Sequence, residues 1–534
     1  MQWGRSAKHT LGSILEINLA KNPEKICLVF ETGGLTYGEL HRRTTAIANG
    51  LAELGVEPGD RVAVFMPNHR DVVEALFALA KLGAVYVGIN TAYVGDYLRH
   101  QLAVAGCKLV VTNQELGERI AAVAHAVPSL QHVVLSGAGD GPLVSCGGLS
   151  VRPVEALLSG PDDRLTTTRP ARWDDPCAIQ YTGGTTGPSK GALITQNYLI
   201  RSSELLADLM KMEEEHVAYT PMPLFHLNAI CTILAAMLKG GTAVIDPWFS
   251  VSRYWEQVRR HQATHISLLG PMMVMLWNKP EADDDAMNPV QIMLCAPVPK
   301  DIHQPFERRF GLDIVTAYGL SEAVPILLSC PTPPGFAGRP SPLFDVRLFD
   351  EDDHEVPTGE VGEIVCRPLE PHVMFEGYFN NPEATVQMWK DLWFHTGDLG
   401  RASGDGYIQF VDRKKDYLRR RGENISSFEA EQAIMTYPKV ADVAVHAVAS
   451  DIGEDEVKAC IVLKPGEVVD FDEVIAHCVE NMPYFAVPRY IEFLEELPRN
   501  PVGRVLKYTL RDRGITADTF DRGPGRPVVH VPRG

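Results

Sequence analysis

The sequence lacks the excess of basic residues that a general nucleic-acid-binding protein needs. Its 50 Lys and Arg residues stand against 68 Asp and Glu residues, which gives a formal charge of −18. Phosphate backbones bind to a basic field, so this role is excluded, although a local basic pocket for a nucleotide is not. The 534 residues are 45% apolar and 22% charged, a globular composition with length for about three or four structural units.

Cysteine patterns and long apolar runs are also missing. The ten cysteines, from Cys27 to Cys478, form no CxxC pair and no Cys/His cluster at zinc spacing. Reduced thiols and a cytoplasmic location are therefore expected, not a disulfide framework. The first residues lack the apolar core of a signal peptide. Glu74 and Lys81 interrupt the most apolar stretch, 72–89, so no membrane span is predicted.

The first half of the chain alternates helical and strand patterns. Thr36 and Glu39 form a capping box, which predicts a helix that begins after Thr36 and ends before Gly55. A second run of alternating elements spans about 190–320. Alternation of this kind predicts an α/β fold with parallel sheets whose faces are covered. The strands expected in the first run are 61–66, 84–89 and 108–112.

From about residue 335 the pattern changes to short β-like segments separated by Gly, Pro and Asp. These segments predict an antiparallel or β-barrel-like subdomain. A basic stretch then precedes a new helix–strand pattern, and we place a domain boundary there. Residues 1–412 would form a large N-terminal domain of two α/β subdomains plus the barrel-like one. Residues 413–534 would form a small, mobile α+β domain with a loose tail from about 520.

The segment most informative about chemistry is Tyr-Thr-Gly-Gly-Thr-Thr-Gly-Pro-Ser-Lys-Gly at 181–191. Its glycines let backbone N–H groups converge on an anion, its threonines add hydroxyl donors, and its lysine adds a positive charge. It contains neither the Gly-Lys-Ser/Thr of a Walker loop nor GxGxxG. It therefore predicts a phosphate site of another kind. The residues expected to bind are Thr182, Gly183, Gly184, Thr185, Thr186, Gly187 and Lys190.

This loop resembles the signature loop of the AMP-forming adenylating enzymes, which include acyl-CoA synthetases, peptide-synthetase adenylation domains and beetle luciferases. The usual serine after the first threonine is Gly183 here, which removes one hydroxyl donor. Other segments resemble further motifs of the superfamily in the same order, from Leu35 to Arg511. The segments 482–490 and 507–511 most resemble the branch of crotonobetaine/carnitine–CoA ligases.

The segment 317–322 resembles the family's Tyr-Gly-x-Thr-Glu motif. The resemblance implies that the Tyr318 ring stacks on adenine, that the Ser321 hydroxyl holds the α-phosphate, and that Glu322 ligates Mg²⁺ among phosphate oxygens. Taken alone, a Tyr-Gly turn before a helix would look the same. Gly319 belongs to the same implied nucleotide set. The upstream segment implied to line the nucleotide and acyl pockets is Cys295, Ala296 and Pro297.

Further segments complete the resemblance. Asp398, in a Thr-Gly-Asp match, is implied to accept hydrogen bonds from both ribose hydroxyls. Arg413 is implied to face the ribose and phosphate, although composition alone would make its stretch a solvated basic loop. His226 is implied to line or gate the carboxylate site, although a histidine beside a phenylalanine is usually a core residue. The implied hinge is Lys415, and the loop 421–426 resembles the one that meets the pantetheine channel.

The segment 498–507 departs from the family pattern. The lysine that bridges the reacting carboxylate and the α-phosphate in the family is Arg504 here. Arginine keeps the charge, but its planar fork is larger and differently aimed than an ammonium group. Losing one well-placed charge contact costs ~10²–10³ in rate. Lys507 is the only nearby lysine, and on a strand it would lie on the opposite face, so we expect Arg504 to act.

The resemblance implies an ATP- and Mg²⁺-dependent acid–CoA ligase, of the kind used in fatty acid metabolism, which forms an acyl-adenylate and releases AMP and pyrophosphate. Its partners would be a carboxylic acid, ATP and CoA, without nucleic acid or integral membrane, and a homodimer is left open. Because the sequence ends soon after Arg511, free CoA is the simpler acceptor. Two alternatives stay open: loading of a separate carrier protein, and a nucleotide-binding pseudoenzyme. The implied catalytic residues are Lys190, His226, Glu322 and Arg504.

Overall fold

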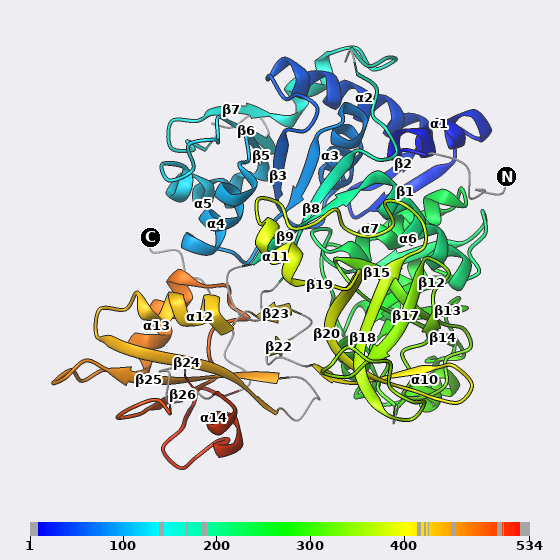
Figure 1. Ribbon diagram of the computed structural model, residues 1–534. Coiled ribbons are helices and arrows are strands. Elements are labelled where there is room, and N and C mark those ends of the chain that lie inside the picture. The colour runs from blue at the N-terminus through cyan, green and yellow to red at the C-terminus, as the bar shows by residue number, and fades with distance from the viewer. Residues whose placement is uncertain are drawn as a thin grey trace.

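The computed structural model describes residues 9–523 without 138–143, 167–168, 183–188, 301, 414–417, 421–422, 426, 450–454, 499–504 and 506. Figure 1 shows a large N-terminal body, coloured blue to yellow, and a smaller C-terminal unit in orange and red. Across the described ranges, three sheets build the body and two build the smaller unit. This is the α/β architecture expected from the sequence.

The first sheet has the strand order β7-β6-β5-β3-β4-β8-β9, with parallel pairs except for the antiparallel edge strand β9. In β3, Val62 and Val64 point into one apolar core, and Ala63 and Phe65 into another, because successive side chains alternate across a strand. Both faces are therefore buried, as the parallel pattern predicted. The strands are β3 (Arg61–Phe65), β4 (Val85–Gly88), β5 (Leu109–Asn113), β6 (His132–Ser136), β7 (Ser150–Pro153), β8 (Pro176–Thr182) and β9 (Lys190–Thr195).

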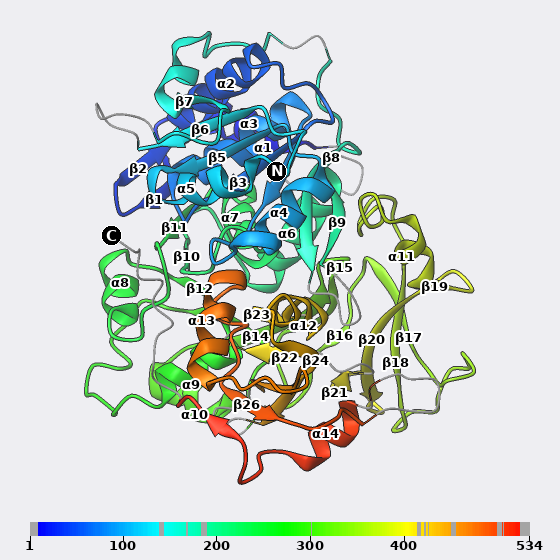
Figure 2. The ribbon, with the colours of Figure 1, turned by 90° about the vertical axis from the view of Figure 1, so that its left-hand side faces the viewer.

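Helices cover both faces of this sheet, with α4 and α5 on one side (Figure 2). The predicted capping box is confirmed: the Thr36 hydroxyl accepts from the Glu39 backbone N–H at 3.1 Å, and the Glu39 carboxylate accepts from the Thr36 N–H at 2.9 Å. The helices are α1 (Leu11–Lys21), α2 (Tyr37–Glu53), α3 (Arg70–Leu82), α4 (Gly95–Ala105), α5 (Gln114–Ala124) and the 3₁₀ helix η1 (Val154–Ser159).

The second sheet has the order β16-β15-β14-β13-β12-β10-β11-β1-β2, parallel from β14 to β1 and antiparallel at both edges. One face packs against α6 and α7, and the other against α8, α9 and α10. The strands are β1 (Ile26–Phe30), β2 (Gly33–Thr36), β10 (Val217–Thr220), β11 (Thr242–Ile245), β12 (His265–Leu269), β13 (Ile292–Ala296), β14 (Asp313–Leu320), β15 (Ala323–Ser329) and β16 (Arg339–Pro340); the helices are α6 (Gln196–Leu209), α7 (Leu227–Leu238), α8 (Tyr254–Arg260), α9 (Gly270–Trp277) and α10 (His303–Phe310).

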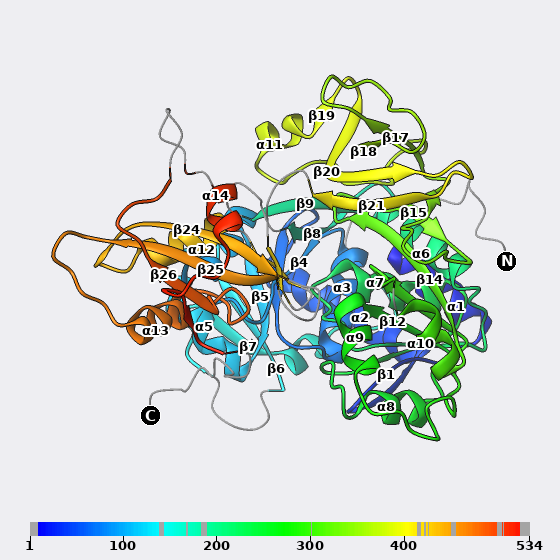
Figure 3. The same ribbon diagram turned by 90° about the horizontal axis from the view of Figure 1, so that it is seen from below.

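The third sheet is antiparallel, as the short β-like segments predicted. Seen from below in Figure 3, it lies beside β9 and β15, so all three sheets of the body meet near these strands. Its elements are β17 (Phe344–Phe349), β18 (Val361–Pro368), α11 (Pro382–Gln387), β19 (Trp389–Lys390), β20 (Trp393–Ala402) and β21 (Ile408–Arg413).

The C-terminal unit joins a two-stranded hairpin to a four-stranded sheet. Lys507 begins a helix and not a strand, so the argument that it would lie on the opposite face of a strand from Arg504 does not apply. The elements are β22 (Leu418–Arg420), β23 (Glu423–Ile425), α12 (Ser427–Met435), β24 (Val440–Ala449), β25 (Asp455–Leu463), α13 (Phe471–Asn481), β26 (Tyr490–Phe493), α14 (Lys507–Arg513) and β27 (Phe520–Asp521).

Two further features of the structure concern its cysteines and its helices. All ten cysteines are free thiols; nine are buried and Cys330 is exposed. Among the described helices, none combines the length and the apolar character that crossing a membrane requires.

Candidate active site

The predicted phosphate loop connects two paired strands at the edge of the first sheet. Thr182 ends β8 and Lys190 begins β9, and the two residues are partners in the antiparallel register. Gly191 is required here, because a Cβ atom at this position would lie 2.6 Å from the Ile179 side chain. The loop residues Gly183, Gly184, Thr185, Thr186 and Gly187 lie outside the described residues.

Glu322 is a buried carboxylate at the turn between β14 and β15. The two strands approach each other closely at this turn, so that a Cβ on Gly319 would lie 2.7 Å from the Ala323 carbonyl oxygen. Glu322 is only 6% exposed, and its Oε1 accepts a hydrogen bond of 2.6 Å from the hydroxyl of Tyr378. The Lys190 ammonium lies 5.0 Å from the centre of the Tyr378 ring. Lys190 and Glu322, from different sheets, therefore meet at Tyr378.

The surroundings act on the Glu322 charge in opposite directions. Burial raises the pKa of this carboxyl above its ordinary value, whereas the Tyr378 hydrogen bond, the Lys190 charge and the Thr182 hydroxyl each lower it. The net pKa is raised because loss of water is the largest influence. A multivalent cation among phosphate oxygens would favour the ionised form of such a carboxylate.

Tyr318, four residues before Glu322, forms a second polar pair with Asp398. The Tyr318 hydroxyl donates to Asp398 Oδ2 at 2.8 Å, which joins β14 to β20. Asp398 is 2% exposed and is the register partner of Arg413 on β21, whose side chain lies outside the described residues. The residue before Asp398, Gly397, lies within β20, and the Glu363 carboxylate accepts from the Gly397 N–H at 3.0 Å.

The remaining predicted nucleotide residues follow the ends of neighbouring strands. Cys295 and Ala296 end β13, and the Cys295 carbonyl accepts from the Thr316 hydroxyl at 2.7 Å. Pro297 follows and is exposed. The Ser321 carbonyl, next to Glu322, accepts from the buried Tyr198 hydroxyl at 3.1 Å. The carboxyl ends of parallel strands share one edge of a sheet, so these residues face the same region.

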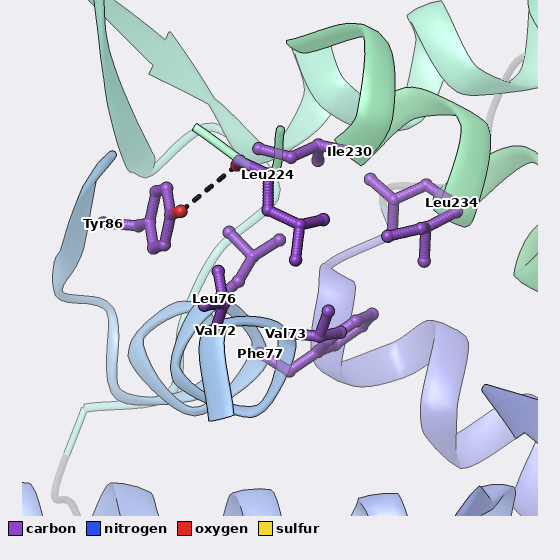
Figure 4. A pocket seen from close by; sticks show the side chains of 9 residues that line it. Val72, Val73, Leu76, Phe77, Tyr86, Leu224, Ile230 and Leu234 are labelled. Atoms are coloured by element: carbon purple, nitrogen blue, oxygen red, sulfur yellow. Dashed lines mark hydrogen bonds between the residues drawn. The ribbon is translucent and has the colours of Figure 1, made fainter. Parts of the chain in front are cut away.

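His226 stands at the start of α7, in a loop that the body holds firmly. Figure 4 shows the Tyr86 hydroxyl donating to the Leu224 carbonyl, at 3.2 Å, beside a small apolar cavity between α3 and α7. His226 is half-buried, and its Nε2 lies 3.3 Å from the carboxylate of Glu423 in the C-terminal unit. The Asn90 amide donates to the same carboxylate oxygen at 3.2 Å. The predicted loop 421–426 therefore contacts the body through Glu423.

The last predicted residue, Arg504, lies outside the described residues. Its neighbour Lys507 is engaged within the C-terminal unit. The Lys507 ammonium donates to the Ser427 hydroxyl at 2.8 Å and pairs with Glu431 at 2.5 Å. Lys507 thus has local partners that account for its charge.

Sequence reasoning missed three residues of this site. Tyr378, Glu423 and Asn90 carry polar contacts that no motif singled out. Glu423 lies inside the loop 421–426, which the sequence analysis singled out, so its position could be predicted but its contact with His226 could not. Tyr378 follows a glycine in an otherwise ordinary segment, and only the folded chain places it beside Glu322.

Comparison with family models gives a match to "AMP-binding enzyme" over residues 15–379 and to "AMP-binding enzyme C-terminal domain" over residues 429–504. A feruloyl-CoA synthase of Amycolatopsis is 34% identical over 90% of this chain and 94% of its own. A crotonobetaine/carnitine–CoA ligase of Salmonella arizonae is 31% identical over 91% of this chain and 96% of its own.

Solved structures share the fold. An o-succinylbenzoate CoA synthetase from Bacillus subtilis, a double mutant bound to a product analogue, has a TM-score of 0.81 at 23% identity, covering 96% of this chain and 100% of its own. The amide bond synthetase McbA from Marinactinospora thermotolerans has a TM-score of 0.82 at 23% identity, covering 95% of this chain and 99% of its own.

Proposed function

The chain belongs to the AMP-binding enzyme family and is an ATP-dependent acid–CoA ligase. We propose that Lys190, Glu322 and His226 line its active site. In the first half-reaction a carboxylate oxygen attacks the α-phosphorus of ATP, pyrophosphate leaves, and an acyl-adenylate forms. In the second, the thiol of CoA attacks the acyl carbon, loses its proton, and AMP leaves. Positioning and charge supply most of such catalysis, so no covalent protein nucleophile is needed.

The observation that carries this assignment is the meeting of Lys190 and Glu322 at Tyr378, together with the hydrogen bond between Tyr318 and Asp398. Lys190 would bind the β- and γ-phosphates with the loop from Thr182. Asp398 would accept from the ribose hydroxyls, and the Tyr318 ring would stack on adenine. The other residues assigned to the nucleotide are Gly183, Gly184, Thr185, Thr186, Gly187, Gly319, Ser321, Cys295, Ala296, Pro297 and Arg413.

We propose Glu322 as the residue that holds Mg²⁺. The described residues contain no group of three or more His, Cys, Asp or Glu that could bind a metal alone. Mg²⁺ bound with a nucleotide usually takes one or two carboxylates and fills its remaining positions with phosphate oxygens and water. A single buried carboxylate with one oxygen on a neutral donor fits that requirement. The metal would supply charge that offsets the triphosphate.

The Glu423–His226 contact supports a role for the C-terminal unit in the second half-reaction. It brings the loop 421–426 to the residue assigned to the acid site. We propose that residues 413–534 form a domain that turns about Lys415 between the two steps. Arg504 would bridge the carboxylate and the α-phosphate in the first step and withdraw in the second.

The acid is proposed to carry a polar group. Asn228 lies in the first turn of α7, two residues after His226, and its amide oxygen accepts from the buried Ser267 hydroxyl at 3.0 Å. Because the amide oxygen accepts from Ser267, the amide N–H₂ group would be the one that donates to a polar group of the acid. The relatives named for feruloyl-CoA and for crotonobetaine or carnitine support testing those acids first. A cytoplasmic location, supported by ten free cysteines, belongs to the same proposal.

The test measures pyrophosphate release with ATP, Mg²⁺, CoA and a panel of ferulic acid, crotonobetaine, anthranilic acid and palmitic acid. We expect acid-dependent release together with AMP and a CoA thioester identified by mass, and Lys190→Met as the loss control. Pyrophosphate release without a CoA thioester would favour a carrier protein as acceptor. ATP binding without turnover of any acid would favour a pseudoenzyme and contradict the proposal. Light scattering of the same preparation decides whether a homodimer forms.

A further inference from the structure

The segment 375–379 ties the phosphate-loop strand to the turn that carries Glu322. At one end, the Phe375 N–H donates to the Glu322 carbonyl at 2.8 Å. Further along, the Glu376 N–H donates to the Leu193 carbonyl at 2.8 Å, the Leu193 N–H to the Gly377 carbonyl at 2.9 Å, and the Phe379 N–H to the Gly191 carbonyl at 2.8 Å. The segment thus adds to the free edge of β9 and holds Glu322 by its own backbone.

Tyr378 is the side chain of this segment that reaches both charged groups. It is 7% exposed, and its hydroxyl donates to Glu322 Oε1 at 2.6 Å. Its ring lies 5.0 Å from the Lys190 ammonium, within the range of a cation–π contact. Burial, with the nearby Glu322 charge, raises the pKa of Tyr378, so the phenol stays protonated and remains the donor.

Neighbouring groups fix the direction of the Tyr378 side chain. The Tyr378 N–H donates to the Thr385 hydroxyl at 2.8 Å, and its ring packs edge-on against Phe375 with centroids 5.1 Å apart. The preceding Gly377 has a φ of 130° and lies so close to Thr385 that an added Cβ would be 3.0 Å from that side chain. Tyr378 is therefore held in one orientation by contacts on both sides.

We propose that Tyr378 is a positioning residue, which sets the Glu322 carboxylate and the Lys190 ammonium at the spacing that a triphosphate and its metal require. This inference rests on the proposed roles of Glu322 and Lys190. One phenol performs both tasks: its hydroxyl occupies one oxygen of Glu322, and its ring face provides a place for the ammonium. Without it, the two opposite charges would be drawn together and would close the space between them.

The direct test is Tyr378→Phe, which keeps the ring and removes only the hydroxyl. We expect ATP affinity in the presence of Mg²⁺, measured by calorimetry, to fall about ten- to a hundred-fold, because a hydrogen bond to a charged group is lost. Affinity without Mg²⁺ should change much less. The matched control is Tyr37→Phe, which removes another buried phenol, one that donates to the Gly241 carbonyl at 2.9 Å.

The Mg²⁺ dependence separates positioning from simple structural support. A phenol that only supported the fold would change ATP affinity to the same extent with and without Mg²⁺. Tyr37→Phe should leave the difference between the two affinities unchanged.

A double-mutant cycle with Glu322→Gln completes the test. Tyr378→Phe should cost little in the Glu322→Gln background, since the residue that it positions is already altered. An equal loss in both backgrounds, or an equal loss with and without Mg²⁺, would overturn the inference. Failure of the proposed function is distinguishable, because the wild-type chain would then bind ATP but release no acid-dependent pyrophosphate.

Discussion

Two buried glutamates in this molecule have opposite surroundings. Glu322, in the body, is 6% exposed and has a neutral phenol as its hydrogen-bond donor, with Lys190 beyond that ring. Glu492, in the C-terminal unit, is 1% exposed and pairs with the buried ammonium of Lys458. Arg513 adds a second cation at 2.7 Å. Burial opposes ionisation of both carboxyls, but the pKa of Glu322 is raised, whereas Lys458 and Arg513 lower that of Glu492.

The comparison shows how one residue type can be left for a ligand in one place and satisfied within the fold in another. Glu492 is satisfied by partners within the fold, including the Thr519 hydroxyl at 3.2 Å, so it needs no ligand. The Glu322 carboxylate is less stable as an anion at this buried site than it would be in water. Binding of a cation beside it would therefore stabilise the ionised form. A raised pKa from burial together with a specific partner is a mark of functional sites.

The largest effect is expected from breaking the structural pair. Lys458→Met leaves the Glu492 carboxylate with less compensation in a dry interior, so the free energy of unfolding should fall by about 3–5 kcal/mol. Urea denaturation of the full chain measures it. Lys464→Met, at an exposed lysine, is the control and should change stability by less than about 0.5 kcal/mol. A loss for Lys458→Met as small as that of the control would mean that water reaches Glu492.

Glu322→Gln should have the next largest effect, on rate and not on stability. Adenylation should fall about 10²–10³-fold, measured as pyrophosphate release, because the carboxylate proposed to hold Mg²⁺ among the reacting phosphates loses its charge. The raised pKa of Glu322 means that its charge destabilises the fold as pH rises through the folded pKa, so Gln should keep or increase stability at neutral pH.

Glu492→Gln is the matched opposite of that variant. A lowered pKa means that ionised Glu492 stabilises the fold above the unfolded carboxyl pKa and that this contribution is lost as pH falls through the folded value. Gln should therefore reduce stability at neutral pH and flatten its decline in acid. Equal stability changes for the two glutamine variants would remove the contrast between the sites.

Local signals in the sequence predicted the elements that local chemistry determines. The Thr36–Glu39 capping box fixed the start of α2, because both partners lie within one turn. Gly55, the predicted stop of that helix, follows its last residues at a φ of 79°, a conformation that glycine adopts without strain. The alternation of strand and helix patterns along the chain likewise predicted the parallel sheets.

Contacts between distant segments could not be read in this way. Tyr378 and Glu322 are 56 positions apart in the sequence. Glu423 and His226 belong to different domains in the division expected from the sequence. Neither pairing has a sequence spacing that would reveal it. The helix at Lys507 was missed because a seven-residue element offers too few turns for a helical pattern.

The smallest effect is expected where one cation replaces another, at Arg504. Arg504→Lys restores the residue type of the family pattern, so pyrophosphate release should be preserved or raised. Lys507→Met is the control, and it should leave that rate unchanged because the Lys507 ammonium is already bound by Glu431 and Ser427. A collapse with Arg504→Lys would show that the guanidinium fork has a distinct role. In that case the contrast between Lys458, which serves structure, and the cation at 504 would depend on hydrogen-bond geometry as well as charge.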